Sequence, residues 1–562
     1  MNEISSPPMG RVINILESAD TVKEFVCTLE RHDSQVMTPI NKCISKIYTP
    51  FWKDKPNHIA VRDPENLKVE RFIKINEEWR NFNKYPLGIV VGHFPKITTL
   101  EDGLKVLDIE FQLRRTLSSS LEREMRDFQR LDLFEDGRID FCMLPTFTID
   151  PADSQDLDDA ISVRDLGECY EIGVHISDVA SFVAKDSELD KYAKLLCTSF
   201  YPCGKEPKHM FPKELSADFF SLIPNQDRRA ISLIIQVDTK TNSIKTSLIC
   251  KSVIQSKRKF SYDEVENILE NKHQQSDLLQ MCLVKAWNFA KVHRRDRKPE
   301  DWCYKKPDED VTLGRRRSHL MVEELMIMFN QMVAERLLFD ETTRSITPLR
   351  CQDRPKSENE HVSHELINRR AMTNPQIHPQ LLPLAMAFSR LFHKACILRS
   401  NSTHVSRIGH YDLDLDSYTW ASSPIRRYID VIVQRLLHSV TDKTNVRYTG
   451  HDIDLSCMEF SRKNDHQSAY EKKSNALHFA IELSNQISFC LILYFLKGCN
   501  ISKQIPARFE IDGYCPAGLS YLNNSQCRAI REALANPFTL IQGPPGERYF
   551  WTLFGFFGLR LL

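Results

Sequence analysis

The sequence predicts a multidomain α+β protein with a β-rich front, a large mixed body and a short C-terminal segment. The chain has 562 residues, and because one domain usually takes about 100–200 residues we expect several hydrophobic cores. The first 115 residues carry short β-rich runs separated by turns, whereas residues 116–495 mix strand patterns with long helical ones. A hydrophobic content of 42% supplies the side chains that such cores need.

Two small β units are expected before residue 116. Residues 1–50 carry two apolar runs around the turn HDS, and we interpret them as part of an incomplete barrel. Residues 51–115 carry the runs HIAVRD, PLGIVVGHF and LKVLDIEFQL, which are rich in strand-forming residues and separated by Pro, Gly or charged turns. A small five-stranded barrel is the expected structure of this second unit.

The body of the chain, residues 116–495, is expected to be one large α/β domain. A helical pattern, SSLEREMRDFQRL, precedes an acidic segment, the expected strands AISV and YEIGVHISDV, and several long helices. The apolar run ISFCLILYFL from Ile487 is too short to span a bilayer, so we interpret it as a buried helix. Residues 496–562 are expected to be a linker followed by a further, incomplete domain.

Charge and cysteine content narrow the class of protein. Lysine plus arginine equals aspartate plus glutamate, 75 of each, so any attraction to nucleic acid must come from a local patch. The 16 cysteines include no CxxC pair, and the chain does not start with a signal-like segment. This pattern favours reduced thiols in a cytosolic or nuclear protein, without a zinc module and without a membrane partner.

The segment TIDPADSQDLDD carries five aspartates within ten positions and no basic residue: Asp150, Asp153, Asp156, Asp158 and Asp159. Side chains alternate between faces in an extended segment, and a turn led by Pro151 lets Asp150 return toward Asp156. We therefore expect four carboxylates to gather in one place, those of Asp150, Asp156, Asp158 and Asp159. Hard divalent cations prefer oxygen ligands, and magnesium commonly bridges carboxylates to phosphates, so the segment suggests metal chemistry.

A solvated acidic loop is the main alternative interpretation of this segment. A calcium EF-hand fails on spacing, because the sixth position from Asp150 is Gln155 rather than glycine and the twelfth is Ile161 rather than glutamate. A second motif is needed to decide between a metal site and a solvated loop.

The segment WASSPIRRYIDVIVQRLLHSV provides that motif. It predicts a helix with Ser423 as N-cap and Pro424 at the first helical position. Arg426 and Arg427 then fall in the first turn, where the helix dipole disfavours cations, so an anion such as a phosphate is expected there. The alternative is an i,i+4 ion pair of Arg426 with Asp430, which stabilises an isolated helix by about 0.3–0.5 kcal/mol.

Six segments follow one another along the chain: TIDPADSQDLDDAISV, VHISDVASFV, MFPKELSADFFSLIPNQDRRAIS, SKRKFSYDEV, MVEELMIMFNQMVAERL and HYDLDLDSYTWASSPIRRYIDVIVQRLL. One by one they resemble the RNB catalytic domain of the ribonuclease II family, over residues 130–495. The resemblance implies a magnesium-dependent hydrolytic exoribonuclease that works from the 3′ end of single-stranded RNA and releases 5′ mononucleotides.

The resemblance also implies roles for individual residues. Four positions match the family's metal-binding aspartates, expected to hold two magnesium ions about 4 Å apart: Asp150, Asp156, Asp158 and Asp159. Asp158 is the residue whose loss should most reduce the chemistry, and Arg426 the one that neutralises the phosphate, with Arg427 as a weaker RNA contact. Tyr201 resembles the aromatic residue that clamps the terminal base, although a core tyrosine is almost as good an interpretation. Asp153 falls outside the motif, and one of the pair Glu323 and Glu324 is expected to line the RNA channel.

The flanking segments resemble other modules. The run GIVVGHF is similar to the second cold-shock barrel (an OB fold) that precedes the catalytic domain in this family, and residues 1–50 resemble the end of a first one. Residues 519–546 resemble the opening of a superfamily 1 helicase, but the sequence after GPPG lacks the lysine of a complete P-loop. We expect no ATPase activity from this segment, and we expect the helicase portion to be incomplete.

Two classes of function are therefore carried forward. The first is an active exoribonuclease, which the complete aspartate motif together with Arg426 favours. The second is an RNA-binding scaffold with weak or no nuclease activity, because the RNB–helicase combination also resembles animal coactivators of nuclear receptors. Nuclear receptors or coactivators are then possible partners beside single-stranded RNA, and the expected localisation is nuclear, cytoplasmic or both.

Overall fold

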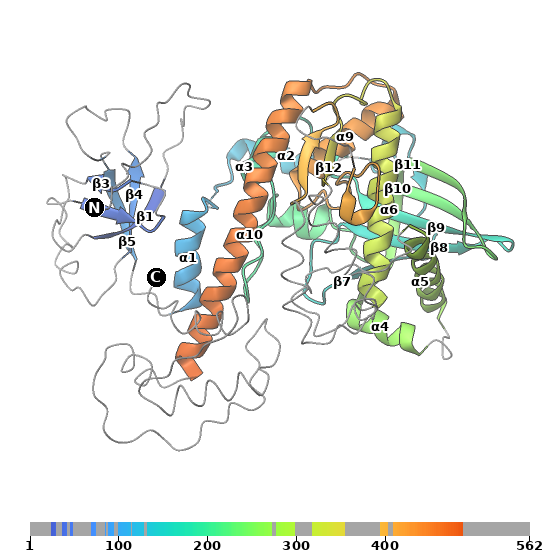
Figure 1. The fold of residues 1–562 in the computed structure, drawn as a ribbon, viewed down its shortest axis with the longest axis horizontal. Coiled ribbons are helices and arrows are strands. Elements are labelled where there is room, and N and C mark those ends of the chain that lie inside the picture. Colours follow the sequence, from blue (N-terminus) through green and yellow to red (C-terminus); the bar gives the residue numbers. More distant parts are fainter. Residues whose placement is uncertain are drawn as a thin grey trace, which may run out of the picture. The chain divides into compact units, whose positions relative to one another are not determined.

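The computed structural model describes the following ranges of the chain: 24–29, 36–41, 45–48, 69–74, 85, 88–94, 99–113, 115–128, 132–271, 277–297, 317–353, 394–402 and 409–486. The chain divides into two compact units, Met1–Arg115 and Thr116–Leu562 (Figure 1). The apolar run from Ile487 and the expected helicase start at 519–546 lie outside the described residues.

The first unit contains one antiparallel sheet of five strands in the order β3-β2-β1-β4-β5. The strands are β1 (Glu24–Leu29), β2 (Val36–Pro39), β3 (Ile47–Tyr48), β4 (Val69–Lys74) and β5 (Gly88–Phe94). β1 pairs with β4, so this sheet joins segments that the sequence had assigned to two separate barrels, 1–50 and 51–115. About 45 residues separate β1 from β4, so the local sequence of either strand does not specify that the two pair.

The expected strand LKVLDIEFQL is wrong, because most of it lies in helix α1 (Leu100–Glu110). Thr99 caps this helix by accepting a hydrogen bond from the amide of Asp102, and two acidic residues occupy the first turn. Val106 and Ile109 pack against Val26 of β1 in a small core. The N-terminal cap and this apolar face outweigh the β-branched content that had favoured a strand.

The second unit is built around a sheet in which five strands close a circuit. In chain order the strands are β6 (Ile139–Asp140), β7 (Thr146–Asp150), β8 (Asp159–Asp165), β9 (Cys169–Ser177), β10 (Asp227–Asp238) and β11 (Ile244–Ser261). The first part of β11 pairs antiparallel with β10 and its end pairs parallel with β7, so the circuit runs β10-β9-β8-β7-β11 and back to β10. The two strands expected from AISV and YEIGVHISDV are confirmed as β8 and β9.

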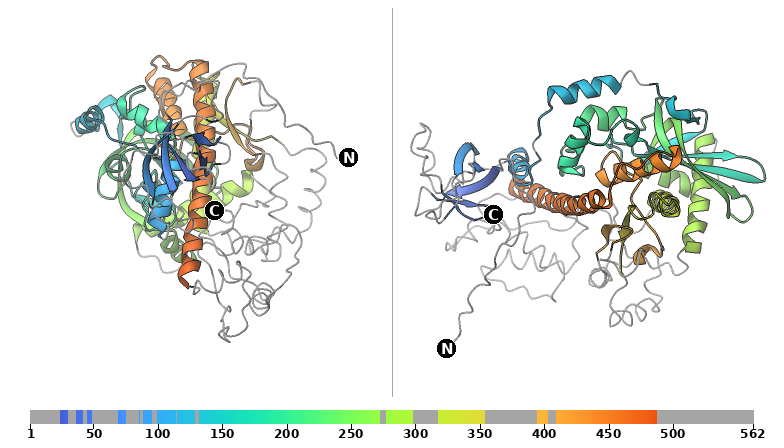
Figure 2. Two further views of the ribbon diagram at one scale, coloured as in Figure 1. Left: turned by 90° about the vertical axis from the view of Figure 1, so that its left-hand side faces the viewer. Right: turned by 90° about the horizontal axis from the view of Figure 1, so that it is seen from above.

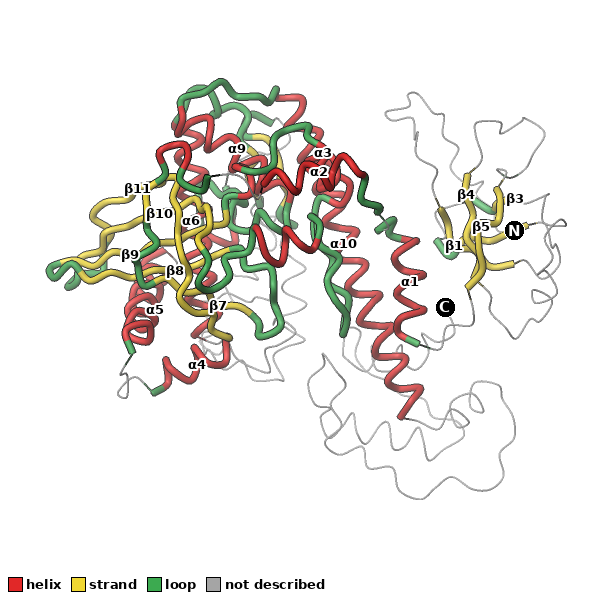
Figure 3. The backbone as a smooth tube through the Cα atoms, turned by 180° about the vertical axis from the view of Figure 1, so that it is seen from behind, coloured by secondary structure: helices red, strands yellow, loops and turns green. Residues whose placement is uncertain are grey.

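The second unit also contains helices, some of which pack on this sheet. They are α2 (Ser119–Asp127), α3 (Glu188–Leu196), α4 (Tyr262–Glu270), α5 (Leu278–Arg297), α6 (Arg317–Phe339), α9 (Tyr428–Asp442) and α10 (Gly450–Gln486). α5 contacts β8 and α6 contacts β9, and Figure 3 shows both helices (red) beside the strands (yellow). The long α10 is seen end to end in Figure 2 (orange) and contacts α9 and β13. Within the described ranges, no helix is both long and apolar enough to cross a membrane.

A two-stranded sheet completes the unit. It pairs β12 (Pro348–Cys351) antiparallel with β13 (Cys396–Arg399). The amide of Arg350 in β12 donates a hydrogen bond to the carbonyl of Tyr418, at 2.8 Å. This bond brings the two-stranded sheet next to the segment that leads into α9.

A buried chain of hydrogen bonds crosses the closed sheet. His175 Nδ1 lies 2.6 Å from Ser232 Oγ and its Nε2 lies 2.9 Å from Ser162 Oγ, while Ser232 Oγ lies 2.6 Å from Ser252 Oγ. Burial lowers the pKa of His175 to about 3, so the ring is neutral and its polar atoms are satisfied by hydroxyls. Gly173 lies beneath this chain, and a Cβ there would approach Ser162 Oγ to 2.4 Å.

We therefore expect Gly173→Ala to lower the free energy of unfolding by about 1–3 kcal/mol, as overpacking of a core usually does. The added methyl group must displace either Ser162 or His175, and both are buried with hydrogen bonds to lose. Gly450→Ala is the matched control, because its Cβ would meet the flexible end of Arg399 at 3.3 Å. Urea unfolding of both variants measures the difference, and equal stability would contradict the explanation.

Candidate active site

The acidic segment forms the connection between β7 and β8. Asp150 is the last residue of β7 and Asp159 the first of β8, and these two strands pair antiparallel. Lys259, on the neighbouring strand β11, donates hydrogen bonds to two carbonyls of the connection, at 2.9 and 2.6 Å. Ser221 accepts a bond from the Leu157 amide at 3.0 Å. The connection is thus held in part through its backbone, without using its carboxylate oxygens for this purpose.

Asp156 is held by side chains. Tyr201 donates its hydroxyl to Asp156 Oδ2 at 2.7 Å, and Ser154 donates to Asp156 Oδ1 at 3.2 Å. The carboxylate is buried, and His209 Nδ1 lies 3.9 Å from Oδ2. Both oxygens of Asp156 therefore already have a protein neighbour.

Asp158 connects the acidic segment to the arginine motif. Its Oδ1 accepts a hydrogen bond from the backbone amide of Ile425 at 2.8 Å, and its Oδ2 lies 3.3 Å from Arg426 Nε. Its own carbonyl accepts from the amide of Ser177 at the end of β9. With only 3% of the residue exposed, Asp158 is fixed from both its backbone and its side chain.

The start of the arginine helix differs from the expectation. α9 begins at Tyr428, and Ser423 is not its N-cap, because residues 423–427 form a turn in which the Arg427 amide donates to the Ser423 carbonyl. Backbone hydrogen bonds to residues 197 and 199 hold this turn in a non-helical shape. A tertiary contact therefore overrides the local helix signal of Ser-Pro.

The two arginines of this turn have different partners. The expected alternative, an ion pair of Arg426 with Asp430, is wrong, since Arg427 Nη2 donates to Asp430 at 2.7 Å instead. Asp430 also accepts from the Ser423 amide at 2.8 Å, so it is the side chain that stabilises the turn. Arg426 is free to face Asp158, and 48% of its side chain is exposed to the cavity.

A cavity of about 770 Å³ collects these residues. It is lined by every residue that the sequence singled out for chemistry or RNA binding: Asp150, Asp156, Asp158, Asp159, Tyr201, Arg426 and Arg427. Glu323 also lines it, whereas Glu324 is buried in ion pairs with His293 and Arg297. Asp153 is exposed and lies outside the lining.

Sequence reasoning missed several other residues of this cavity. They come from α4, α6, β12 and the segment before α9: Tyr262, His319, Arg350, Asp412, Tyr418 and Trp420. Tyr262 and His319 stack with ring centroids 3.9 Å apart. Each of these residues stands alone in its helix, strand or loop, so no spacing pattern in the sequence indicates that it lines a site. Trp420 is the exception, because it lies within the TWASSPIRRY segment.

The four carboxylates expected to bind metal all line this one cavity. In the described ranges, no three His, Cys, Asp or Glu side chains converge closely enough to hold a metal ion. Asp150 Oδ2 and Asp158 Oδ2 are nevertheless buried without a hydrogen-bond partner. Magnesium usually binds one or two carboxylates together with waters and substrate phosphate oxygens, so these two atoms fit such an ion better than a closed protein cage.

The pKa values of the carboxylates show the cost of gathering them. Burial and then the charge of Asp159 raise the pKa of Asp150, against the effect of Lys259. Burial raises the pKa of Asp158 well above its usual range, although Arg426 and the Ile425 amide oppose it. Burial also raises the pKa of Asp159 to about 6, despite both arginines. The cations of the chain therefore offset only part of the penalty, and a bound cation would offset more.

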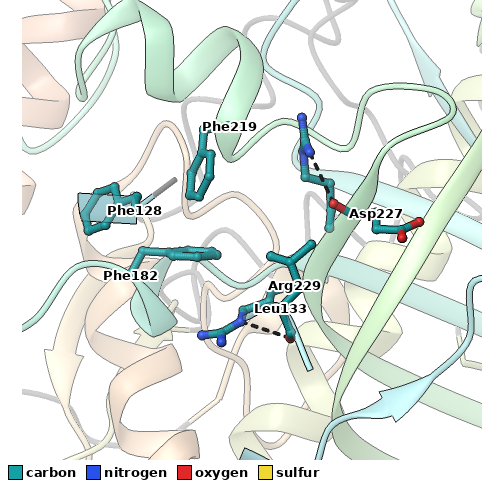
Figure 4. Close-up of a pocket in the computed structure, with 7 residues that line it drawn as sticks. Phe128, Leu133, Phe182, Phe219, Asp227 and Arg229 are labelled. Carbon is teal, nitrogen blue, oxygen red and sulfur yellow. Dashed lines mark hydrogen bonds between the residues drawn. The ribbon is translucent and has the colours of Figure 1, made fainter. Parts of the chain in front are cut away.

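A second, smaller cavity of about 170 Å³ has a different character (Figure 4). Its wall includes the rings of Phe128, Phe182 and Phe219. Its arginines are already used, because Arg229 donates to the carbonyl of Leu133 and stacks over Phe182, and its neighbour Arg228 binds Asp218. The arginines of this cavity are therefore already engaged, and much of its wall is aromatic.

Comparison with known proteins defines the class. The family model of the RNB domain matches residues 138–443. The chain belongs to the RNB domain family, and the expected resemblance is confirmed over the part that contains the acidic segment and the arginine turn.

Two relatives match most of this chain in sequence. The chain is 33% identical to the "3'-5' exoribonuclease HELZ2" of Homo sapiens, over 85% of this chain and 19% of that protein. It is 32% identical to the "Ribonuclease R" of Chlamydia pneumoniae, over 69% of this chain and 57% of that protein. The chain thus spans about a fifth of the human relative's length and little more than half of the bacterial one's.

Solved structures share the fold. The apo form of Mycoplasma genitalium RNase R matches with a TM-score of 0.66 at 23% identity, covering 86% of this chain and 80% of that one. Yeast Ssd1, described as a pseudonuclease, matches with a TM-score of 0.64 at 17% identity, covering 85% of this chain and 61% of that one. The second unit is therefore an RNB-type fold of mixed sheet and helices.

The raised pKa of Asp158 predicts a stability change. A carboxyl group whose pKa is raised on folding favours the folded state at low pH, and this contribution is lost as pH rises through the folded value. Without divalent cations, Asp158→Asn should therefore increase the free energy of unfolding at pH 7.5, by the order of 1 kcal/mol. The increase should shrink as the pH is lowered through the raised pKa of Asp158.

Thermal or urea unfolding in EDTA measures this difference between variant and wild type. Magnesium should then stabilise the wild type more than Asp158→Asn. A variant that is less stable than wild type at pH 7.5 in EDTA would show that the pairing of Asp158 with Arg426 outweighs the penalty of burial.

Proposed function

We propose that this protein is a magnesium-dependent 3′-to-5′ exoribonuclease that hydrolyses single-stranded RNA to 5′ mononucleotides. The observation that carries this proposal is the contact between Asp158 and Arg426 on the wall of the 770 Å³ cavity. It places the acidic segment beside a half-exposed guanidinium, which is the combination that a phosphodiester and its metal ions need. The relatives described as a 3′-5′ exoribonuclease and as ribonuclease R support the same activity.

The residues that line the cavity have different proposed roles in hydrolysis. Arg426 faces the cavity and is positioned to neutralise charge that develops on the phosphate. Asp150 Oδ2 and Asp158 Oδ2, which accept no hydrogen bond, would hold magnesium, and Asp156 and Asp159 line the same cavity. Magnesium ions, two by the family pattern, would supply an activated water and charge neutralisation when bound. Asp430 keeps Arg427 in the turn, so Arg427 contributes mainly to the shape of the site.

Tyr201 is suited to hold the terminal base. Its hydroxyl is bound to Asp156, so its ring is fixed at the cavity wall. A fixed ring can stack on any base, which fits an enzyme that degrades RNA without regard to sequence.

A second function is supported by one observation. The fold of this chain is shared with yeast Ssd1, whose structure is described as that of a pseudonuclease, so the fold by itself does not require hydrolysis. In that case the protein would be an RNA-binding scaffold or a coactivator of nuclear receptors with weak or no nuclease activity, in the nucleus, the cytoplasm or both. The buried oxygens of Asp150 and Asp158 that accept no hydrogen bond favour the first proposal.

The test of hydrolysis is decay of 5′-labelled single-stranded RNA with magnesium. Wild type should shorten the RNA from its 3′ end and release 5′ mononucleotides, and Asp158→Asn should be at least about a hundredfold slower, as for loss of a group that stabilises the transition state. Asp153→Asn is the matched control, because Asp153 lies in the same connection but is exposed and outside the cavity. Binding of RNA without decay, equal in wild type and Asp158→Asn, would support the scaffold instead.

The role of Tyr201 predicts different results for two substitutions. Tyr201→Phe keeps the ring and removes the bond to Asp156, so it should change the rate by only a few fold. Tyr201→Ala removes the stacking surface and should weaken binding of the 3′ end by roughly 1–3 kcal/mol. Steady-state rates and RNA affinities of the two variants separate these effects; equal losses would assign the role to the hydroxyl.

A further inference from the structure

Three arginines line the 770 Å³ cavity, and two of them already have carboxylate partners. Arg426 Nε lies 3.3 Å from Asp158 Oδ2, and Arg427 Nη2 donates to Asp430 at 2.7 Å. Arg350 differs, because its guanidinium makes no ion pair and no hydrogen bond with any residue in the part of the chain that the structure describes. Its N–H donors are therefore unused in a cavity that we assign to an anionic polymer.

Arg350 is nevertheless held in place. Its backbone amide donates to the Tyr418 carbonyl at 2.8 Å, and its Cζ lies 4.1 Å from the centroid of the Trp420 ring. Trp420 in turn packs edge-on against Phe460, at 5.8 Å between ring centroids. A guanidinium that is stacked on a fixed indole loses little freedom when it binds a ligand, so its donors are ready for one.

The charges around Arg350 favour an added anion. Burial lowers its pKa to about 10, and the neighbouring Arg427, whose Cζ lies 4.3 Å from the same Trp420 ring, lowers it as well. Asp412 lines the same cavity and counteracts this effect, but it makes no ion pair with Arg350. A partly buried cation without a bound anion is a costly arrangement, which a ligand that brings negative charge would relieve.

We propose that Arg350 binds a phosphodiester of the RNA at a linkage other than the one hydrolysed, and that Trp420 is the residue that positions it. The planar fork of N–H groups on arginine matches phosphate oxygens in a bidentate fashion. Arg426 faces Asp158, where the proposed function places the scissile linkage, so Arg350 marks a second phosphate position along the strand. This inference rests on the proposed function for the identity of the ligand.

The first experiment measures affinity without hydrolysis. The full chain with Asp158→Asn is titrated with a fluorescent single-stranded RNA in EDTA, with and without Arg350→Gln. We expect Arg350→Gln to weaken binding about tenfold and to reduce the slope of log K against log salt by about 0.7, the value for one phosphate contact on a single strand. Arg164→Gln is the matched control, since Arg164 pairs with Glu171, is 48% exposed and lies outside the cavity lining.

The second experiment locates the phosphate. RNAs that carry one neutral methylphosphonate are compared, one linkage at a time from the 3′ end. One internal linkage should cost about tenfold in affinity with Arg350 present and almost nothing with Arg350→Gln, because both changes remove the same contact. If every linkage costs the same in both proteins, or if Arg350→Gln binds like Arg164→Gln, the proposal is overturned.

Two features keep the result interpretable. Arg350→Lys retains the charge and should recover part of the affinity, and the methylphosphonate series in the Arg350 protein does not depend on how well the variant folds. Failure of the nuclease proposal would appear as intact binding without decay of RNA by the wild type. Failure of the Arg350 proposal would appear as unchanged binding and linkage dependence.

Discussion

The site depends on the hydrogen bond from the Ile425 amide to Asp158, which joins segments 267 residues apart. Asp158 belongs to the connection between two strands of the closed sheet, and Ile425 belongs to the turn that carries both arginines. The bond fixes the separation of the acidic and basic halves of the cavity. The pKa of Asp158 is nevertheless raised, because this bond and the contact with Arg426 offset only part of the penalty of burial.

The repulsion among the aspartates of the acidic connection is only partly offset. The backbone of the acidic connection is held by Lys259 and Ser221, which stabilise its shape without using up the carboxylate oxygens. The remaining negative charge is left partly uncompensated, because Asp150 Oδ2 and Asp158 Oδ2 are buried without a hydrogen bond. Strongly shifted carboxyl groups that line a cavity are more common at functional sites than elsewhere, which is consistent with the proposed function.

The two arginines in the basic half of the cavity have different roles. Asp430 accepts hydrogen bonds from Arg427 and from the Ser423 amide, and these bonds stabilise the turn. Arg426 makes no bond to Asp430 and remains available to a phosphate. Trp420 contacts both Arg427 and Arg350, so one aromatic ring connects the turn to the two-stranded sheet. Because the fold is shared with a protein described as a pseudonuclease, it is this arrangement of charges, rather than the fold, that argues for hydrolysis.

The sequence by itself determined the mixed fold of the second unit, the strands around the acidic segment and the candidate residues from Asp150 to Arg427, because these depend on local periodicity and on ordered motifs. Only the tertiary structure decided that β1 pairs with β4, that α9 begins at Tyr428, and that Arg350 lines the cavity. Each of these depends on partners far away in the chain. A local pattern specifies which conformations a segment favours, but the contact that selects one of them is made only when distant segments pack together.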